Sequence, residues 1–320
     1  MRILVVGATG FVGGHLLAEC RERGDTLSGT FRPGEQLPMG DGVSWHGVEV
    51  LDSQAMDAAL AATRPEGIVY LAGQANVALG NRDPVNTFRI NAEGTLRMLG
   101  AMDREAPDAR IIVVTSAEVY GVTAQDQMPV KEDAPLSPRT PYGVSKAAAD
   151  LAAAQASGSG GLDVIRIRPF NHVGPGQRRG FVVPDFASQI AAIEVGQATP
   201  ELKVGNLSAR RDFTDVRDIV RGYREALDHG KTGEVYNLCS GHSVAIDDLV
   251  RELVDRASVD IRIVRDESRL RPSDVPEFRG DPTRAQRDFG WKATIPLERS
   301  LTDVLEEWRR AARSSTHLPD

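Results

Sequence analysis

Tyr142 and Lys146 stand four residues apart in TPYGVSK, and Ser116 lies twenty-six residues before the tyrosine, in IIVVTSAEVYG. A phenol exchanges protons poorly near neutral pH because its ordinary pKa is about 10, and a cation one helical turn away is expected to lower that pKa. Thr140 as the N-cap and Pro141 as the first helical residue predict a helix that places both side chains on one face. Together these residues indicate proton transfer at a carbonyl oxygen.

The segment GATGFVG at the start of the chain places Gly7, Gly10 and Gly13 between an apolar strand and a helical pattern. Glycines in such a turn let the backbone approach a pyrophosphate closely, and the positive end of the following helix attracts the anion. A glycine pattern alone is also compatible with an ordinary strand–helix turn, but the order strand, turn, helix is the context that the dinucleotide-binding motif requires. With Tyr142 and Lys146, the turn indicates a nicotinamide dinucleotide.

The end of the predicted second strand, TLSGTF, bears on the choice of cofactor. The acidic residue that would bind the ribose 2'-hydroxyl of NAD is missing there, and Asp25 lies at the wrong end of the strand. Arg32 follows the strand and is suited to a 2'-phosphate, although an arginine is also compatible with an ordinary exposed surface. We therefore expect NADPH, with NADH possible, and we expect Asp52 to accept a hydrogen bond from the adenine amine.

The composition limits the class of protein. With 320 residues, 41% of them hydrophobic, the chain can bury a sizeable core. A formal charge of -7 without a basic patch argues against nucleic acid or an anionic membrane as a partner. Cys20 and Cys239 suit reduced thiols, and neither a signal-peptide pattern nor a membrane-length apolar run occurs, so we expect a cytoplasmic protein. The six histidines lack metal-ligand spacing, and we expect no metal site.

Short apolar strands alternate with helical stretches from RILVVG to LDVIRIRPF, which predicts an α/β fold with a Rossmann-type, doubly wound parallel sheet. After Asn171 this alternation becomes irregular. We expect an NADP-binding domain formed by residues 1–172 and 211–239. We expect a smaller, discontinuous C-terminal α/β domain, formed by residues 173–210 and 240–320, to bind the substrate.

With these segments in view, the chain resembles, over nearly its whole length, the extended short-chain dehydrogenase/reductases of the nucleotide-sugar epimerase and dehydratase type. Ser116, Tyr142 and Lys146 match the catalytic residues of that family, and Asn91 in NAEGTL matches its structural asparagine. The segments KVGNLSARRDFTDVRDIV, VYNLCSG and LRPSDVPEFRGDPTRAQRDFGW are similar to enzymes that handle GDP-linked 6-deoxyhexoses. LAGQ followed by RDP, with PFNHVGPGQ, resembles reductases that convert GDP-4-keto-6-deoxy-D-mannose to GDP-D-rhamnose.

The resemblance implies two sets of binding residues. The cofactor is expected to contact Gly7, Thr9, Gly10, Phe11, Val12, Gly13, Arg32, Leu51, Asp52, Leu71, Ala72, Gly73, Asn91, Tyr142, Lys146 and Pro169. The substrate is expected to contact Gln74, Asn171, His172, Arg178, Lys203, Arg211, Arg271 and Asp274. In relatives the arginines at positions 211 and 271 bind the diphosphate with charge-assisted hydrogen bonds, and an acid at position 274, more commonly glutamate, binds the guanosine ribose. His172 is alternatively a structural histidine, and Arg178 part of a solvated turn.

The residues after Ser116 bear on the reaction. A dehydratase of this family needs, after oxidation at C4, a base to remove the C5 proton and an acid to help the C6 hydroxide depart. Ala117 donates no proton, whereas Glu118 remains, either to position substrate or as a partly exposed acid at a strand end. We expect a reductase in which hydride reaches C4 of the keto sugar, Tyr142 protonates the oxygen, Ser116 hydrogen-bonds it, and Lys146 tunes the phenol and holds the nicotinamide ribose.

Other readings stay open at this stage. GDP-mannose 4,6-dehydratases are the first alternative, because they share the segment RRD with this chain. They typically carry GQDG at the position where this chain has GFVG. An NDP-sugar 4-epimerase is the second, and a non-enzymatic NADP-binding protein is disfavoured by the intact serine, tyrosine and lysine. The family also implies pairing of helices between subunits, and the small side chains of AAADLAAAQA permit it, so we expect a homodimer or a dimer of dimers.

Overall fold

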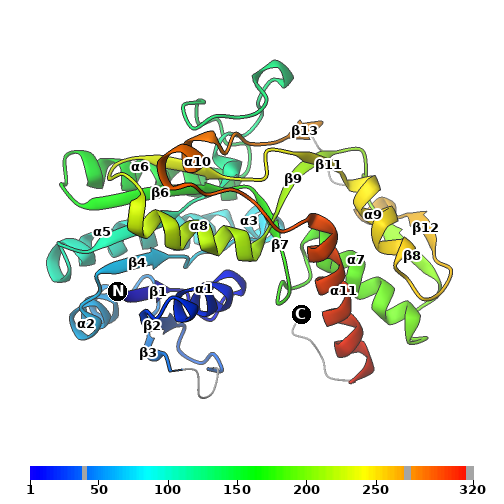
Figure 1. Cartoon of the computed structure of the whole chain (residues 1–320), viewed down its shortest axis with the longest axis horizontal. Coiled ribbons are helices and arrows are strands. Elements are labelled where there is room, and N and C mark those ends of the chain that lie inside the picture. Colours follow the sequence, from blue (N-terminus) through cyan, green and yellow to red (C-terminus); the bar gives the residue numbers. More distant parts are fainter. Residues whose placement is uncertain (38–41, 270–274, 315–320) are drawn as a thin grey trace.

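The computed structural model describes residues 1–37, 42–269 and 275–314 (Figure 1). Its central sheet has the strand order β10-β6-β5-β4-β1-β2-β3, and every pairing in it is parallel. The strands are β1 (Arg2–Val6), β2 (Thr26–Phe31), β3 (Ser44–Gly47), β4 (Gly67–Tyr70), β5 (Arg110–Val114), β6 (Asp163–Pro169) and β10 (Val235–Leu238). The winding reverses between β1 and β4, which opens a crevice at their carboxyl ends. The Rossmann-type sheet expected from the sequence is confirmed.

Helices cover both faces of this sheet. On one face lie α1 (Phe11–Glu22) and α8 (Val216–His229), and on the other lie α2 (Ser53–Thr63), α5 (Gly94–Glu105) and α6 (Pro141–Gly158). Ile3 and Val5 of β1 belong to the core under the first pair, whereas Leu4 and Val6 belong to the core under the second group. Because successive strand residues point to opposite faces, a strand is apolar wherever it is buried on both sides, as residues 3–6 are, whereas Arg2 at the start of β1 is exposed.

Two smaller groups of strands lie beside the central sheet, to its right in Figure 1. Strand β9 (Arg210–Asp215) pairs with β7 (Asn171–Val173), β11 (Ser243–Ala245) and β13 (Glu277–Phe278), and β8 (Glu201–Val204) pairs with β12 (Arg262–Arg265). Helices α7 (Val182–Glu194), α9 (Ile246–Asp255) and α11 (Leu297–Arg313) share a separate core with them. The expected boundary at residue 211 thus falls inside β9, which pairs outside the central sheet, and the division into two domains stays a prediction.

The remaining elements are short. They are α3 (Val77–Arg82), α4 (Pro84–Phe88), a π-helical turn (Arg89–Glu93), α10 (Thr283–Phe289) and three 3-10 turns (Ala117–Val119, Gln125–Gln127 and Glu267–Arg269). Within the described ranges, no helix combines the length and apolar character that a membrane crossing needs. The same ranges hold no cluster of three or more His, Cys, Asp or Glu side chains placed to bind a metal ion.

Candidate active site

The glycine turn sits where β1 meets α1, at the crevice. Gly7 has a φ of 86° and donates its N–H to Thr30 Oγ1 at 2.9 Å. A Cβ added at Gly7 would come within 2.9 Å of the Ala72 backbone, and one added at Gly13 would come within 2.4 Å of the Ala8 carbonyl oxygen. Gly10 is the N-cap of α1 and has no side chain to cap its first amides. The turn therefore fits a pyrophosphate, which needs close backbone approach and open N–H groups.

Arg32 directly follows β2, and its side chain is 68% exposed. Its guanidinium lies 3.4 Å from Glu35 Oε1, and its backbone N–H donates to Glu35 Oε2 at 3.2 Å. The hydroxyl of Thr9 donates to the same carboxylate at 2.6 Å. Glu35 thus links the glycine turn to Arg32. The sequence reasoning missed this role, although Glu35 stands only three residues after Arg32. A nucleotide 2'-phosphate would compete with Glu35 for Arg32, and the role of Arg32 in cofactor binding stays a prediction.

Asp52 has a structural role that the sequence reasoning did not foresee. Strand β3 ends at Gly47, so Leu51 and Asp52 follow it after a short loop, and Asp52 Oδ1 accepts hydrogen bonds from the N–H groups of Gln54 and Ala55. Asp52 therefore caps α2. This cap orients the carboxylate in the absence of any adenine, and adenine binding by Asp52 is untested.

The residues after β4 connect the glycine turn to α6. Leu71, Ala72 and Gly73 follow β4 directly, and a Cβ added at Gly73 would lie 2.8 Å from Asn91 Oδ1 and 3.5 Å from Lys146 Nζ. The segment from Leu71 to Gly73 therefore runs between the glycine turn and Lys146, along the path expected for the cofactor.

Asn91 lies buried in the π-helical turn and braces this path. Its Oδ1 accepts from Gln74 N at 2.8 Å, while its Nδ2 donates to Gln74 O at 3.0 Å and to Ser145 Oγ at 2.9 Å. The Gln74 side chain in turn donates to Thr87 Oγ1 at 3.1 Å and accepts from the N–H of Asn76. Asn91 thus ties the segment after β4 to α6, which supports the structural role expected for it.

The three catalytic candidates are brought together as the sequence predicts. Helix α6 begins at Pro141, and Thr140 caps it by accepting a hydrogen bond from Gly143 N at 3.0 Å. Ser116 follows β5, and its hydroxyl hydrogen-bonds the buried hydroxyl of Tyr142. The Lys146 ammonium donates to Val114 O at 2.9 Å, two residues before the serine. The start of α6 is confirmed, and the catalytic roles stay predictions.

The electrostatics of Tyr142 differ from the expectation. Burial raises the pKa of Tyr142 to about 12, the charge of Glu118 adds to this shift, and the hydrogen bond from Ser116 only opposes it. The pKa of Lys146 is lowered to about 8 because its ammonium is buried. The fall in the Tyr142 pKa that the lysine spacing predicts does not appear in the protein itself, since desolvation of the phenolate dominates. Tyr142 therefore keeps its proton at neutral pH, as a proton donor must.

Glu118 and Arg211 lie close enough for their charges to interact. Glu118 has an exposed side chain, the surrounding protein raises the pKa of its carboxyl, and Arg211 opposes that rise. Burial lowers the pKa of Arg211, and Glu118 opposes that fall. Because the Glu118 N–H donates to Ser116 Oγ at 3.1 Å, this pair links the predicted diphosphate site on β9 to Ser116.

His172 lies against the glycine turn. Its ring stacks on Phe11 with centroids 6.1 Å apart and an interplanar angle of 7°. Its Nδ1 lies 3.0 Å from Phe170 O, and burial lowers its pKa, so the neutral ring carries its hydrogen on Nδ1 and leaves Nε2 as an acceptor. Asn171 beside it on β7 is exposed. The stack connects the first turn of α1, which also holds Val12, to the predicted substrate residues after Pro169 of β6.

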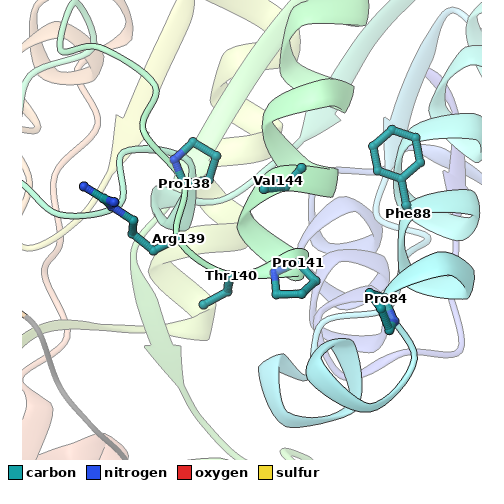
Figure 2. Close-up of a pocket in the computed structure, with 7 residues that line it drawn as sticks. All are labelled: Pro84, Phe88, Pro138, Arg139, Thr140, Pro141 and Val144. Atoms are coloured by element: carbon teal, nitrogen blue, oxygen red, sulfur yellow. The ribbon is translucent and has the colours of Figure 1, made fainter.

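The other predicted substrate residues lie farther apart in the fold. Arg178 is exposed in the loop between β7 and α7, and Lys203 is exposed on β8, where it pairs with Val264 of β12. Arg271 and Asp274 lie outside the described residues. An apolar pocket of about 380 Å³ also lies outside the crevice, between Pro84 and Phe88 of α4 and the stretch from Pro138 to Val144 at the start of α6 (Figure 2).

Comparisons with known proteins agree with this arrangement. The family model described as GDP-mannose 4,6 dehydratase matches residues 4–304. The chain is 36% identical over 312 residues to the GDP-6-deoxy-D-mannose reductase of Pseudomonas aeruginosa, covering 98% of each protein. It is 28% identical to the UDP-glucose 4-epimerase of Bacillus subtilis, covering 97% of this chain and 96% of the epimerase. A solved structure of RMD from Pseudomonas aeruginosa, complexed with NADPH, has a TM-score of 0.85 and 35% identity, and the match covers 97% of this chain and 99% of that one.

Proposed function

The chain belongs to the GDP-mannose 4,6-dehydratase family, and we propose that it is an NADPH-dependent reductase of GDP-4-keto-6-deoxy-D-mannose. The product is GDP-6-deoxy-D-mannose, or GDP-D-rhamnose. The observation that carries this proposal is the full-length similarity to a GDP-6-deoxy-D-mannose reductase, at 36% identity over 98% of the chain. The residues of the crevice supply the groups that such a reduction needs.

The crevice fits a nicotinamide dinucleotide phosphate. Gly7 and Gly13 leave room that a side chain would fill, the first amides of α1 are open, and Arg32 stands exposed at the end of β2. NADPH, when bound, supplies the hydride that reduces a ketone. The structural relative RMD was solved with NADPH, which supports the same cofactor here.

The chain's own residues handle the substrate oxygen. Tyr142 gives its proton to the oxygen at C4 as negative charge develops there, and its raised pKa keeps that proton in place until then. An alkoxide is more basic than a phenolate, so this transfer is favourable even from a weak phenol. Ser116, hydrogen-bonded to Tyr142, donates to the same oxygen. On this proposal Lys146, one helical turn along α6, stabilises the phenolate left on Tyr142 after transfer.

The same site argues against dehydration as the main reaction. Elimination needs an acid and a base beyond the tyrosine, and Ala117 offers neither. Glu118 remains; desolvation by the surrounding protein raises the pKa of its carboxyl, Arg211 partly offsets that rise, and we assign Glu118 to binding and orientation of the substrate. On this proposal Arg211 and Arg271 bind the diphosphate of the sugar nucleotide, Asp274 binds the guanosine ribose, and Gln74, Asn171, His172, Arg178 and Lys203 complete the substrate site.

The two parts of the chain divide this work on our proposal. Residues 1–172 and 211–239 bind NADP, and residues 173–210 and 240–320 bind the sugar nucleotide. The core shared by α7, α9 and α11 supports this division, although Ala285, Phe289 and Trp291 of the second part pack into the core under the central sheet. Nucleic acid and membranes are not partners of the acidic chain. The buried free thiols of Cys20 and Cys239 suit the reducing cytoplasm, where we place the protein.

Two parallel incubations separate the candidate activities. The protein is mixed with NADPH and GDP-4-keto-6-deoxy-D-mannose, and separately with GDP-mannose and NADP. Loss of NADPH in proportion to the keto sugar consumed is the expected result. Conversion of GDP-mannose without net change of the cofactor would identify a 4,6-dehydratase, conversion to the C4 epimer a 4-epimerase, and binding without turnover a non-enzymatic protein.

We further propose that the protein is at least a homodimer, paired through the helices beside the catalytic residues. Large apolar side chains are exposed on α4, α5 and α6, and they are Val85, Phe88, Leu96, Val144 and Leu151. The pocket in Figure 2 adjoins Phe88 and Val144 of this surface. Exposed apolar patches of this kind mark interfaces. Light scattering at micromolar concentration is expected to give a dimer or tetramer mass, and a mass near 34.6 kDa would contradict the proposal.

A further inference from the structure

A buried ion pair lies one turn along α6 from the catalytic lysine. Asp150 stands four residues after Lys146 and is fully buried. Arg168 of β6 binds it through two hydrogen bonds, Nε to Oδ2 and Nη2 to Oδ1, both at 2.8 Å. Arg166 adds a bond of 3.0 Å to Oδ1. The carboxylate is therefore held in one orientation on the same helix that carries Tyr142.

This ion pair also contacts both ends of residues 115–120, the segment that carries the catalytic serine. At the near end, Thr115 Oγ1 lies 3.1 Å from Asp150 Oδ2 and shares its proton with Ile167 O. At the far end, Arg168 Nη1 donates to the hydroxyl of Tyr120 at 3.0 Å, and its guanidinium lies 5.0 Å from the centre of the Tyr120 ring. Ser116 and Glu118 lie between these two anchors.

These contacts hold α6 against the end of β5 and the segment that follows it. Tyr142 stands on α6, and Ser116 stands on the segment after β5. Lys146 donates to the carbonyl oxygen of Val114, the last residue of β5, and Asp150 accepts a hydrogen bond from Thr115, the first residue after β5. Because the Thr115–Asp150 hydrogen bond is buried and the Lys146–Val114 hydrogen bond is partly buried, a shift of Ser116 relative to Tyr142 would break charge-assisted hydrogen bonds that water replaces poorly.

We propose that the Asp150–Arg168 pair, acting through Thr115 and Tyr120, positions the Ser116 hydroxyl against the hydroxyl of Tyr142. The consequence for turnover rests on the proposed function, because it assumes that the two hydroxyls meet the substrate oxygen together. Asp150 and Arg168 are positioning residues, since neither reaches the reacting atoms. Replacing Asp150 would leave Arg168 buried without a counter-charge, and replacing Arg168 would leave the buried carboxylate with only Arg166, so the test uses the two anchors instead.

The first measurement needs no turnover. The protein is labelled with carbon-13 at the tyrosine ring carbon that bears the hydroxyl. The Tyr142 resonance is assigned by its loss in Tyr142→Phe. Its chemical shift reports whether the Tyr142 hydroxyl is hydrogen-bonded. Ser116→Ala defines the shift that loss of the bond produces. Thr115→Val is expected to move the resonance in the same direction, and Thr115→Ser, which keeps the hydroxyl, to leave it in place. A wild-type resonance in Thr115→Val overturns the proposal. If Thr115→Val does not fold, Tyr120→Phe loosens the other anchor and is judged by the same criterion.

The second measurement uses kinetics with NADPH and the keto sugar. Thr115→Val is expected to lower kcat roughly 10- to 100-fold, as displacement of a catalytic group does, while KM changes little. In a Ser116→Ala background the same substitution is expected to cause no further fall, because its effect runs through the serine. Equal losses in both backgrounds would show an effect unrelated to Ser116 and overturn the proposal. Absence of wild-type turnover would instead refute the proposed function, and the resonance of Tyr142 would still decide the positioning role.

Discussion

The two ends of the crevice are built in different ways. At the glycine end, Gly7, Gly10 and Gly13 shape the site by lacking side chains, and the backbone of Ala8 and Ala72 closes around them. At the catalytic end, Ser116, Tyr142 and Lys146 are held by buried side chains from several strands and α6, among them the Asp150–Arg168 pair. Side-chain atoms added at the glycine end should therefore weaken cofactor binding, whereas side-chain atoms removed at the catalytic end should lower kcat.

Tyr142→Phe tests the catalytic end with the largest expected effect. The ring and its packing remain, so the fold and NADPH affinity should survive, while kcat falls ~10²–10⁴-fold because general acid catalysis is lost. Steady-state kinetics and a cofactor titration measure both quantities. Near-normal turnover would show that another acid, such as Glu118 or His172, protonates the C4 oxygen.

Arg32→Ala tests the outer edge of the glycine end. If Arg32 binds the 2'-phosphate, the variant should lose roughly 1.5–3 kcal/mol of NADPH binding, the usual range for a hydrogen bond to a charged group. Binding of NADH, which has no such phosphate, is the matched control and should be unchanged. Glu35→Gln should act in the opposite direction, because Glu35 pairs with Arg32 in the structure. Equal losses for both cofactors would contradict this role of Arg32.

Gly13→Ala tests the interior of the glycine end. The added Cβ would meet the Ala8 carbonyl oxygen at 2.4 Å, so the turn must shift, at a cost of about 1–3 kcal/mol in unfolding free energy. NADPH affinity should fall with it. Gly14→Ala is the matched control, because a Cβ there meets nothing within 4 Å, and alanine should stabilise the helix by about 0.5–1 kcal/mol. Denaturant unfolding and cofactor titration of the two variants compare them, and equal behaviour would mean that the turn tolerates side chains.

The features read correctly from the sequence are those set by neighbours along the chain. The strand–turn–helix around Gly7, the parallel strands and the start of α6 after Thr140 depend on local spacing and capping, which a sequence displays. The family resemblance added the pairing of Ser116 with Tyr142, which spacing alone does not reveal.

The features missed depend on partners distant in sequence or on burial. Asp150 finds Arg168 and Thr115 only after folding, although its place one turn after Lys146 was a signal that it shares the inner face of α6. Burial also reversed the expected direction of the Tyr142 pKa, because desolvation is invisible in a list of residues. The sequence therefore predicts which groups meet more reliably than how strongly they ionise.

The pH dependence of activity distinguishes Lys146 from Tyr142 and has the smallest expected effect. With the Lys146 pKa lowered to about 8 by burial, the ammonium loses its charge as pH rises through that value, whereas Tyr142 stays protonated until about pH 12. The kcat/KM of the wild-type enzyme should therefore fall above about pH 8, by at most tenfold per pH unit. His172 titrates on the acid side, because its pKa is lowered from 6.5, and cannot produce this limb. Lys146→Met should show low activity that is flat across this range, and persistence of the alkaline fall in that variant would assign it to another group.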